Sequence, residues 1–122
     1  MVIFDTNTIL RYILQDVQDM ADIAEQQLSE AGCYVPTEVV AELVYVLNKV
    51  YKIDREIVAK TLDDFFEMRN VSVNSHNVVN IALDVFADTN LDFVDCMLVG
   101  YAKIESYEIF TFDKALKKCL NS

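Results

Sequence analysis

Four short apolar runs, each followed by a longer segment with helical periodicity, constrain the fold of this chain more than any other feature. The runs are too short to be buried helices and suit buried strands of a parallel sheet. Because parallel strands need long crossover connections, the alternation predicts an α/β protein. The four predicted strands are Val2–Phe4, Cys33–Val35, Val71–Val73 and Glu108–Phe112.

The segments between the predicted strands have apolar residues three and four positions apart, which is typical of helices with one buried face. Thr37 and Asp54 are suited to cap two helix starts, and Gly32 is suited to end another helix. With right-handed crossovers, the pattern predicts a three-layer α/β/α sandwich that forms a single domain over residues 1–122. The predicted helices cover residues 6–14, 19–31, 37–50, 54–69, 76–88, 92–106 and 113–120.

The chain is strongly acidic, with 20 Asp and Glu against 10 Lys and Arg and a formal net charge of −10. A protein that coats nucleic acid needs Lys and Arg to neutralise phosphates, so this charge excludes that class. It leaves open an enzyme that handles nucleic acid through metal ions. With only two glycines and one proline, the chain is not a linker or a disordered segment.

Cysteine usage and hydropathy indicate a cytoplasmic protein. Cys33, Cys96 and Cys119 are odd in number and form no CxxC pair, so free thiols are expected. Zinc binding is not expected with the lone His76, which suits an ordinary helix start or surface position. No signal peptide and no membrane-spanning run are visible in the sequence.

Acidic residues fall where a parallel sheet would bind a ligand. Asp5 ends the first predicted strand and Asp113 ends the fourth, at the carboxyl edge where such sheets hold their ligands. Asp92 and Asp95 open the helix before the fourth strand. The start of that helix is expected near the same edge of the sheet. Glu42 borders the apolar stripe of its helix, from which a carboxylate can point into a cleft. The sequence therefore predicts a cluster of carboxylates.

Each of these acids also has a structural explanation. Asp is a favoured N-cap residue, an acid in a first turn complements the helix dipole, and a glutamate is often a surface residue. Clustered carboxylates, however, repel one another. A stable protein usually tolerates this repulsion only when a bound cation offsets the negative charge. Ligands that are all oxygens favour Mg²⁺ or Mn²⁺.

Four motifs occur in order along almost the whole chain: Val2-Ile3-Phe4-Asp5-Thr6-Asn7, the segment from Val35 to Leu43, the segment from Asp92 to Val99, and Ile109-Phe110-Thr111-Phe112-Asp113. With this order and spacing, the chain resembles the PIN-domain ribonucleases, particularly the VapC-type toxins of bacterial and archaeal toxin–antitoxin pairs. The resemblance implies a parallel sheet between helices that usually ends in a fifth short strand. Here the chain leaves little room for a fifth strand after Leu120.

The resemblance implies a site, a reaction and partners. The reaction would be Mg²⁺- or Mn²⁺-dependent endoribonuclease cleavage of RNA with metal-activated water. A homodimer and inhibition by a cognate antitoxin protein would also be expected. The implied metal ligands are Asp5, Glu42, Asp95 and Asp113, with Asp92 as a less regular further acid, and Asn7 and Thr111 as supporting polar residues. Arg11 and Lys114 follow two of these acids closely and are candidates for contacts with RNA phosphates.

Three alternatives remain open. A PIN-like scaffold could bind a partner without cleaving RNA, and a housekeeping RNA-processing nuclease without an antitoxin would have the same site. A phosphatase of the haloacid dehalogenase kind also begins with an aspartate at a strand end. It needs a second aspartate two residues later, where this chain has Asn7, so it is disfavoured.

Overall fold

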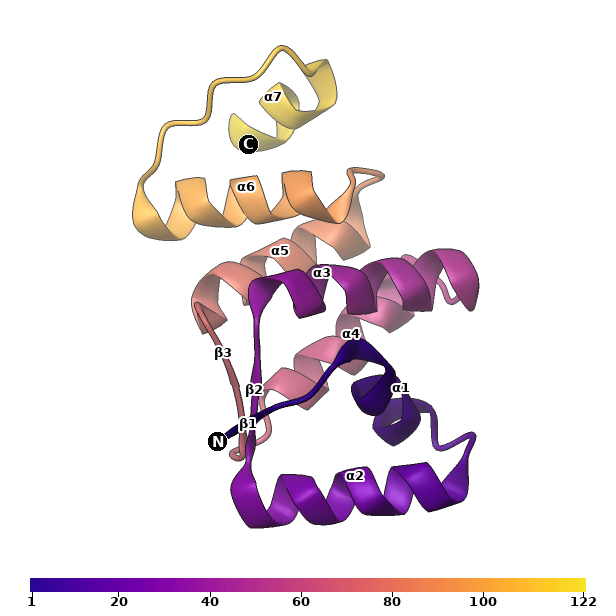
Figure 1. Cartoon of the computed structure of the whole chain (residues 1–122). Coiled ribbons are helices and arrows are strands. Elements are labelled where there is room, and N and C mark those ends of the chain that lie inside the picture. Colours follow the sequence, from indigo (N-terminus) through magenta and orange to yellow (C-terminus); the bar gives the residue numbers. More distant parts are fainter.

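The sheet of this protein has three parallel strands, with β2 at the centre (Figure 1). The computed structural model describes residues 1–122. Strand β1 (Val2–Ile3) pairs with β2 (Cys33–Val35), and β2 pairs with β3 (Val71–Val73). The register places Cys33 between Val2 and Val71. The α/β class, the parallel sheet and three of the predicted strands are confirmed.

The predicted helices are present, with ends that differ by at most a few residues. Helices α4 and α5 lie against β3, α5 packs between α4 and α6, and α1 and α2 pack against each other (Figure 1). The helices are α1 (Thr6–Leu14), α2 (Gln18–Ala31), α3 (Thr37–Tyr45), α4 (Arg55–Phe66), α5 (His76–Asp88), α6 (Phe93–Glu105) and α7 (Lys114–Leu120).

The predicted helix over residues 37–50 has the expected extent but changes its hydrogen bonding part-way. After α3, the chain continues as a π-helical turn, η1 (Val46–Val50). The wider turn is followed by a connection in which the Asn48 side-chain amide donates to the Ile53 carbonyl at 2.9 Å. The Ile53 amide in turn donates to the Leu47 carbonyl at 3.0 Å, which satisfies a carbonyl that the end of a helix would leave without a partner.

The predicted fourth strand, Glu108–Phe112, is wrong. Residues 106–113 form no strand pair, and the chain has neither a fourth nor a fifth strand. Helix α6 ends at Glu105, and the φ of 61° at the next residue, Ser106, turns the chain away from the sheet. The chain then runs along the outer side of α6 to α7 (Figure 1). The residues of this segment favour a strand, but their preference does not determine which strand the segment would pair with.

One continuous core holds these elements together. It contains 28 buried residues and reaches from Phe4, which follows β1, to Leu116 of α7. Helices α5 and α6 approach closely at Gly100, where an added Cβ would lie 2.6 Å from the Val78 carbonyl oxygen. The absence of a side chain at Gly100 therefore sets how closely α6 packs on α5.

The cysteines, the histidine and the length of the helices agree with the sequence. All three cysteines are free, as predicted. His76 is the first residue of α5, and its Nε2 lies 3.1 Å from Glu67 Oε1, which confirms its ordinary structural position. None of the helices has both the length and the apolar character that a membrane crossing requires.

Candidate acidic site

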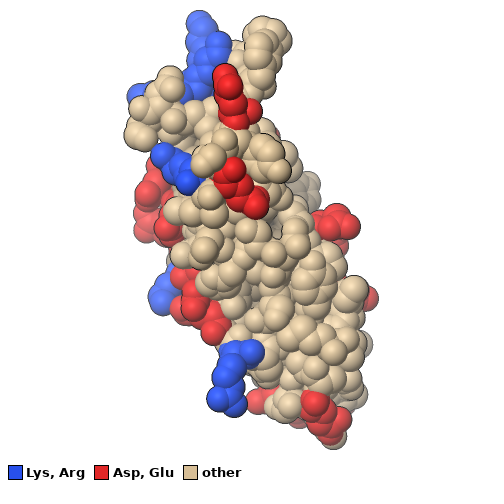
Figure 2. Space-filling view, turned by 90° about the vertical axis from the view of Figure 1, so that its left-hand side faces the viewer, with Lys and Arg blue, Asp and Glu red and all other residues tan.

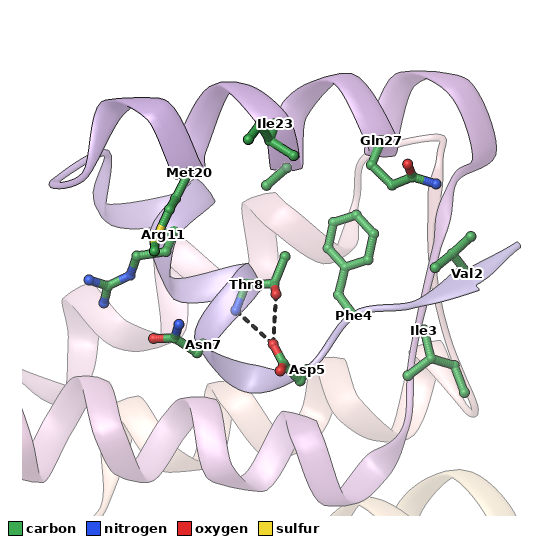
Figure 3. Close-up of a pocket in the computed structure, with 11 residues that line it drawn as sticks. Val2, Ile3, Phe4, Asp5, Asn7, Thr8, Arg11, Met20, Ile23 and Gln27 are labelled. Atoms are coloured by element: carbon green, nitrogen blue, oxygen red, sulfur yellow. Dashed lines mark hydrogen bonds between the residues drawn. The ribbon is translucent and has the colours of Figure 1, made fainter.

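Asp5 follows β1 directly and caps the start of α1. One oxygen of its carboxylate accepts hydrogen bonds from the Thr8 backbone amide at 2.9 Å and from the Thr8 hydroxyl at 2.7 Å (Figure 3). These hydrogen bonds lower the pKa of Asp5 below its usual value, since they favour the charged form. The capping explanation for Asp5 is therefore confirmed, and Asp5 is an anion at neutral pH.

Asp5 lies in a groove of about 540 Å³ between β1 and α2 (Figure 3). Arg11 also lines this groove, and its guanidinium donates to Asp16 at 3.0 Å and to the Tyr51 hydroxyl at 2.9 Å. The charge of Arg11 is thus partly engaged within the protein. The other lining residues are Val2, Ile3, Phe4, Asn7, Thr8, Met20, Ile23, Ala24 and Gln27.

A second group of acids lies at the start of α6. The half-buried Asp95 is in the first turn and makes no hydrogen bond within the protein. Burial, and then the charges of Asp113 and Asp92, raise the pKa of Asp95. Asp92 occupies the N-cap position but accepts no capping hydrogen bond, so the capping explanation fails for its side chain.

Asp113 caps the start of α7, as its structural explanation predicted. Its Oδ1 accepts a hydrogen bond from the Leu116 amide at 2.8 Å. The Thr111 hydroxyl in turn accepts a hydrogen bond from the Asp113 amide at 3.0 Å, so Thr111 orders the backbone at this acid. The neighbouring Lys114 is exposed and forms no ion pair.

Glu42 lies on the helix that separates the two acidic groups. Helix α3 packs against both α1, which follows Asp5, and α6, which carries Asp95. The Glu42 side chain is exposed and makes no hydrogen bond within the protein. It is therefore free to contact a ligand.

The predicted ligand residues do not form a metal site in this arrangement. No three Asp, Glu, His or Cys side chains lie close enough together to hold one metal ion. The physical reason is the path of the chain after α6: Asp113 follows a segment that lies on α6 rather than beside β1. The donors are all oxygens, as a hard cation requires, but Asp5 and the acids around Asp95 remain apart.

Arg55 is a residue of this region that the sequence did not point to. Its Nε donates to the Phe86 carbonyl at 2.8 Å, a second nitrogen donates to the Leu91 carbonyl, and the guanidinium lies 3.6 Å from the centre of the Phe86 ring. It fixes the connection from α5 to α6, and its charge acts on Asp92. Its partners are carbonyl groups 31 and 36 residues away, so no local pattern could reveal them.

With the fold and the acids described, comparison with known proteins identifies the family. The sequence profile of the PIN domain matches residues 2–119, so the chain belongs to the PIN domain family. A VapC ribonuclease from Aquifex aeolicus (strain VF5) is 26% identical over 123 residues, which cover 97% of this chain and 91% of that protein. No solved structure matches the chain significantly. The predicted relationship to PIN-domain proteins of the VapC type is confirmed.

Proposed function

We infer that this protein is an endoribonuclease that hydrolyses phosphodiester bonds of RNA and serves as the toxin of a toxin–antitoxin pair. The observation that carries this proposal is the match to the PIN domain across residues 2–119. The similarity to a protein named VapC ribonuclease supports it, because it extends over 97% of the chain. Four acidic residues at or near the starts of helices offer the carboxylate oxygens that a metal-dependent hydrolysis would need.

The proposed cofactor is Mg²⁺ or Mn²⁺, held by Asp5, Glu42, Asp95 and Asp113. Two observations support a cation near Asp95: burial and neighbouring acids raise the pKa of this carboxyl, and no hydrogen bond within the protein uses it. A bound cation would offset this repulsion. Because the four side chains are not gathered, the proposal requires Asp113 to reach the end of β1 where Asp5 lies. Asp92 is proposed as an additional acid.

RNA contacts are proposed for a small number of basic and polar residues. A net charge of −10 disfavours tight binding of RNA in general, so selection of a particular RNA sequence or shape is proposed instead. Lys114 is exposed and unpaired beside Asp113, which suits a phosphate contact. Arg11 faces the groove that holds Asp5, and Asn7 lines the same groove. Asn7 and Thr111 are proposed to support the acids.

The proposed protein partners are a cognate antitoxin and a second copy of the chain. Large apolar side chains remain exposed on several elements, which leaves surface for both partners. Co-expression with the product of the neighbouring reading frame tests the first partner: a stable complex that lacks ribonuclease activity is expected. Full activity of the complex would contradict inhibition by that protein.

A second candidate function is a PIN-domain scaffold that binds a partner and cleaves nothing. The observation that favours it is the absence of three acids close enough to hold a metal ion. Metal binding separates the two candidates, because a ligand that binds only the folded state raises the melting temperature.

The test combines a melting curve with an RNA cleavage assay in Mg²⁺, in Mn²⁺ and in EDTA. The nuclease proposal predicts a higher melting temperature in millimolar Mg²⁺ or Mn²⁺ and cleavage that EDTA stops. The scaffold alternative predicts neither effect. Cleavage that continues in EDTA would contradict the proposed cofactor while leaving the nuclease function in place.

A further inference from the structure

The outer edge of β1 lacks a strand partner. β1 pairs with β2 on one side only, so the main-chain groups of its other side face outward. The side chains of Val2 and Ile3 are 38% and 61% exposed. Figure 2 shows the side of the molecule on which the strands lie in Figure 1, and its centre is largely free of charged residues. Free edges of this kind accept an additional strand.

An apolar groove continues from this edge to α2. Phe4 points from the end of β1 toward α2, and Met20 and Ile23 reach down from α2 (Figure 3). Met20 and Ile23 are exposed in spite of their apolar character. The groove therefore has room and apolar walls for large side chains of an added strand.

The segment that was predicted as a fourth strand has the complementary features. The main chain of residues 107–112 forms no backbone hydrogen bond and belongs to no helix or strand. Phe110 and Phe112 are 86% and 85% exposed, and their ring centres lie 5.4 Å apart. The two rings therefore form a pair of neighbouring apolar projections, and residues two apart would share one face if the segment joined a sheet.

We propose that residues 108–112 of a second copy of this chain pair in parallel with β1 and place Phe110 and Phe112 in the groove between β1 and α2. The alignment sets residues 110–112 opposite residues 2–4. In this register the two phenylalanines share a face with Val2 and Phe4, and Phe4 points toward α2 (Figure 3). The pairing would satisfy main-chain groups that are unpaired on both partners.

A second copy suits the groove better than the segment of the same chain. In Figure 1, α6 lies between the segment and β1. To reach its own β1, the segment would have to draw α7 away from α6, although Leu116 of α7 is only 2% exposed and Lys103 donates to the Ser122 carbonyl at 3.2 Å. Pairing with another molecule keeps these contacts.

We place the pairing in a closed dimer with two identical contacts, because reciprocal exchange between two copies leaves no segment and no groove unpaired. Four buried phenylalanine rings would remove about 600–1,000 Å² from water. With the paired backbones added, the area approaches the roughly 1,200–2,000 Å² of stable interfaces.

The same register places Asp113 of one copy opposite Asp5 of the other. Asp95 lies near Asp113 on its own chain, so the pairing would bring acids of both groups to one edge of the widened sheet. This consequence rests on the proposed nuclease function. It makes the acidic site a property of the dimer, with residues from both copies.

Cysteine cross-linking tests the pairing without reference to activity. In a Cys119→Ser background, where the other two cysteines are buried, one chain carries Ile3→Cys and a chain of different mass carries Thr111→Cys. Neighbouring strands lie at a distance that a disulfide spans, about 4.4–6.8 Å between Cα atoms. The proposal predicts a mixed disulfide on oxidation, and none when Ile57→Cys replaces Ile3→Cys. No mixed disulfide, or an intrachain disulfide when one chain carries both cysteines, would overturn it.

Removal of the two rings tests the groove. The Phe110→Ser, Phe112→Ser double variant is expected to sediment as a monomer, whereas the wild type and the control Ile57→Ser, which removes another exposed apolar residue, sediment as dimers. A double variant that remains dimeric, or a monomeric wild type at high micromolar concentration, would overturn the proposal.

Mixing of two inactive variants tests the shared site. If Asp5→Asn and Asp113→Asn chains are refolded together, half of the dimers are mixed and each has one intact site, which predicts about a quarter of wild-type cleavage. A cross-linked mixture that stays inactive, while the wild type cleaves RNA, overturns the shared site. An inactive wild type would count against the proposed function, and the cross-link would still decide the pairing.

Discussion

Thr8 donates both its backbone amide and its hydroxyl to a single oxygen of Asp5, at 2.9 and 2.7 Å. The second oxygen of Asp5 accepts no hydrogen bond within the protein, and the same is true of Asp113, which caps α7 with Oδ1 alone. Each of these aspartates therefore stabilises a helix with one oxygen and keeps the other available for a ligand. Capping and ligand binding are compatible at both positions.

Substitutions of Asp5 separate its capping role from its proposed role in cleavage. Asn caps a helix about as well as Asp, whereas Ala removes the cap and lowers the free energy of unfolding by roughly 0.5–2 kcal/mol. Asp5→Asn is thus expected to be nearly as stable as the wild type, and Asp5→Ala less stable, with RNA cleavage lost in both. Urea unfolding measures the first effect. Equal destabilisation by Asn and Ala would contradict the capping geometry.

Gly100→Ala is expected to destabilise the protein. The new Cβ would lie 2.6 Å from the Val78 carbonyl oxygen, so α6 must move away from α5 and disturb the core. Overpacking of this kind lowers the free energy of unfolding by about 1–3 kcal/mol. The control Glu105→Ala, at the exposed end of α6, is expected to change it little. Thermal unfolding of both variants checks the result, and an unchanged Gly100→Ala would rule out the close packing described.

The raised pKa of Asp63 predicts how the free energy of unfolding changes with pH. Burial first, and then the charges of Glu67, Asp84 and Asp64, raise the pKa of Asp63, while His76 opposes the shift. The folded state therefore binds a proton more tightly than the unfolded state. The contribution of Asp63 to stability falls as pH rises from its unfolded pKa, about 3.9, through its raised folded value.

Comparison of Asp63→Asn with the wild type isolates this effect. The variant is expected to gain stability relative to the wild type as pH rises through that window, with a constant difference above it. Urea unfolding at a series of pH values measures the difference. A gain that grows toward low pH would have the wrong sign for a raised pKa.

Arg55→Lys is expected to destabilise the connection between α5 and α6 even though it keeps the positive charge. Lysine cannot reproduce the planar fork that donates to Phe86 and Leu91 or the stacking on the Phe86 ring. Each unsatisfied carbonyl lowers the free energy of unfolding by about 1–3 kcal/mol if it stays buried. The exposed Arg69→Lys is the matched control, and equal stability of the two variants would contradict this role for Arg55.

The local parts of this structure could be predicted from the sequence, and the long-range placements could not. Short apolar runs at Val2, Cys33 and Val71 were sufficient to predict three parallel strands, and Asp5 and Asp113 were recognisable as caps. The segment that contains Phe110 was predicted to join the sheet because its residues favour an extended chain. Its position depends instead on where α7 buries Leu116, which no local pattern specifies.

The same distinction applies to the candidate site. The residue types of the acids indicated a hard cation, and the family match supports a nuclease. Sequence order could not show that Asp113 lies on the side of α6, away from Asp5. Whether Asp113 lies near Asp5 depends on which strand residues 107–112 pair with. The structure leaves both this segment and the outer edge of β1 unpaired.

The most direct test of the central claim is the rate of RNA cleavage by Asp95→Asn in Mg²⁺, measured beside the wild type and Asp84→Asn. Asp95 makes no hydrogen bond within the protein, and its raised pKa indicates that its charge is unfavourable in the fold, so the variant is expected to fold with an equal or higher melting temperature. Asp84 is an exposed acid on α5, away from the candidate site. The proposed function predicts cleavage by the wild type and by Asp84→Asn and none by Asp95→Asn. Cleavage by folded Asp95→Asn at the wild-type rate would contradict it.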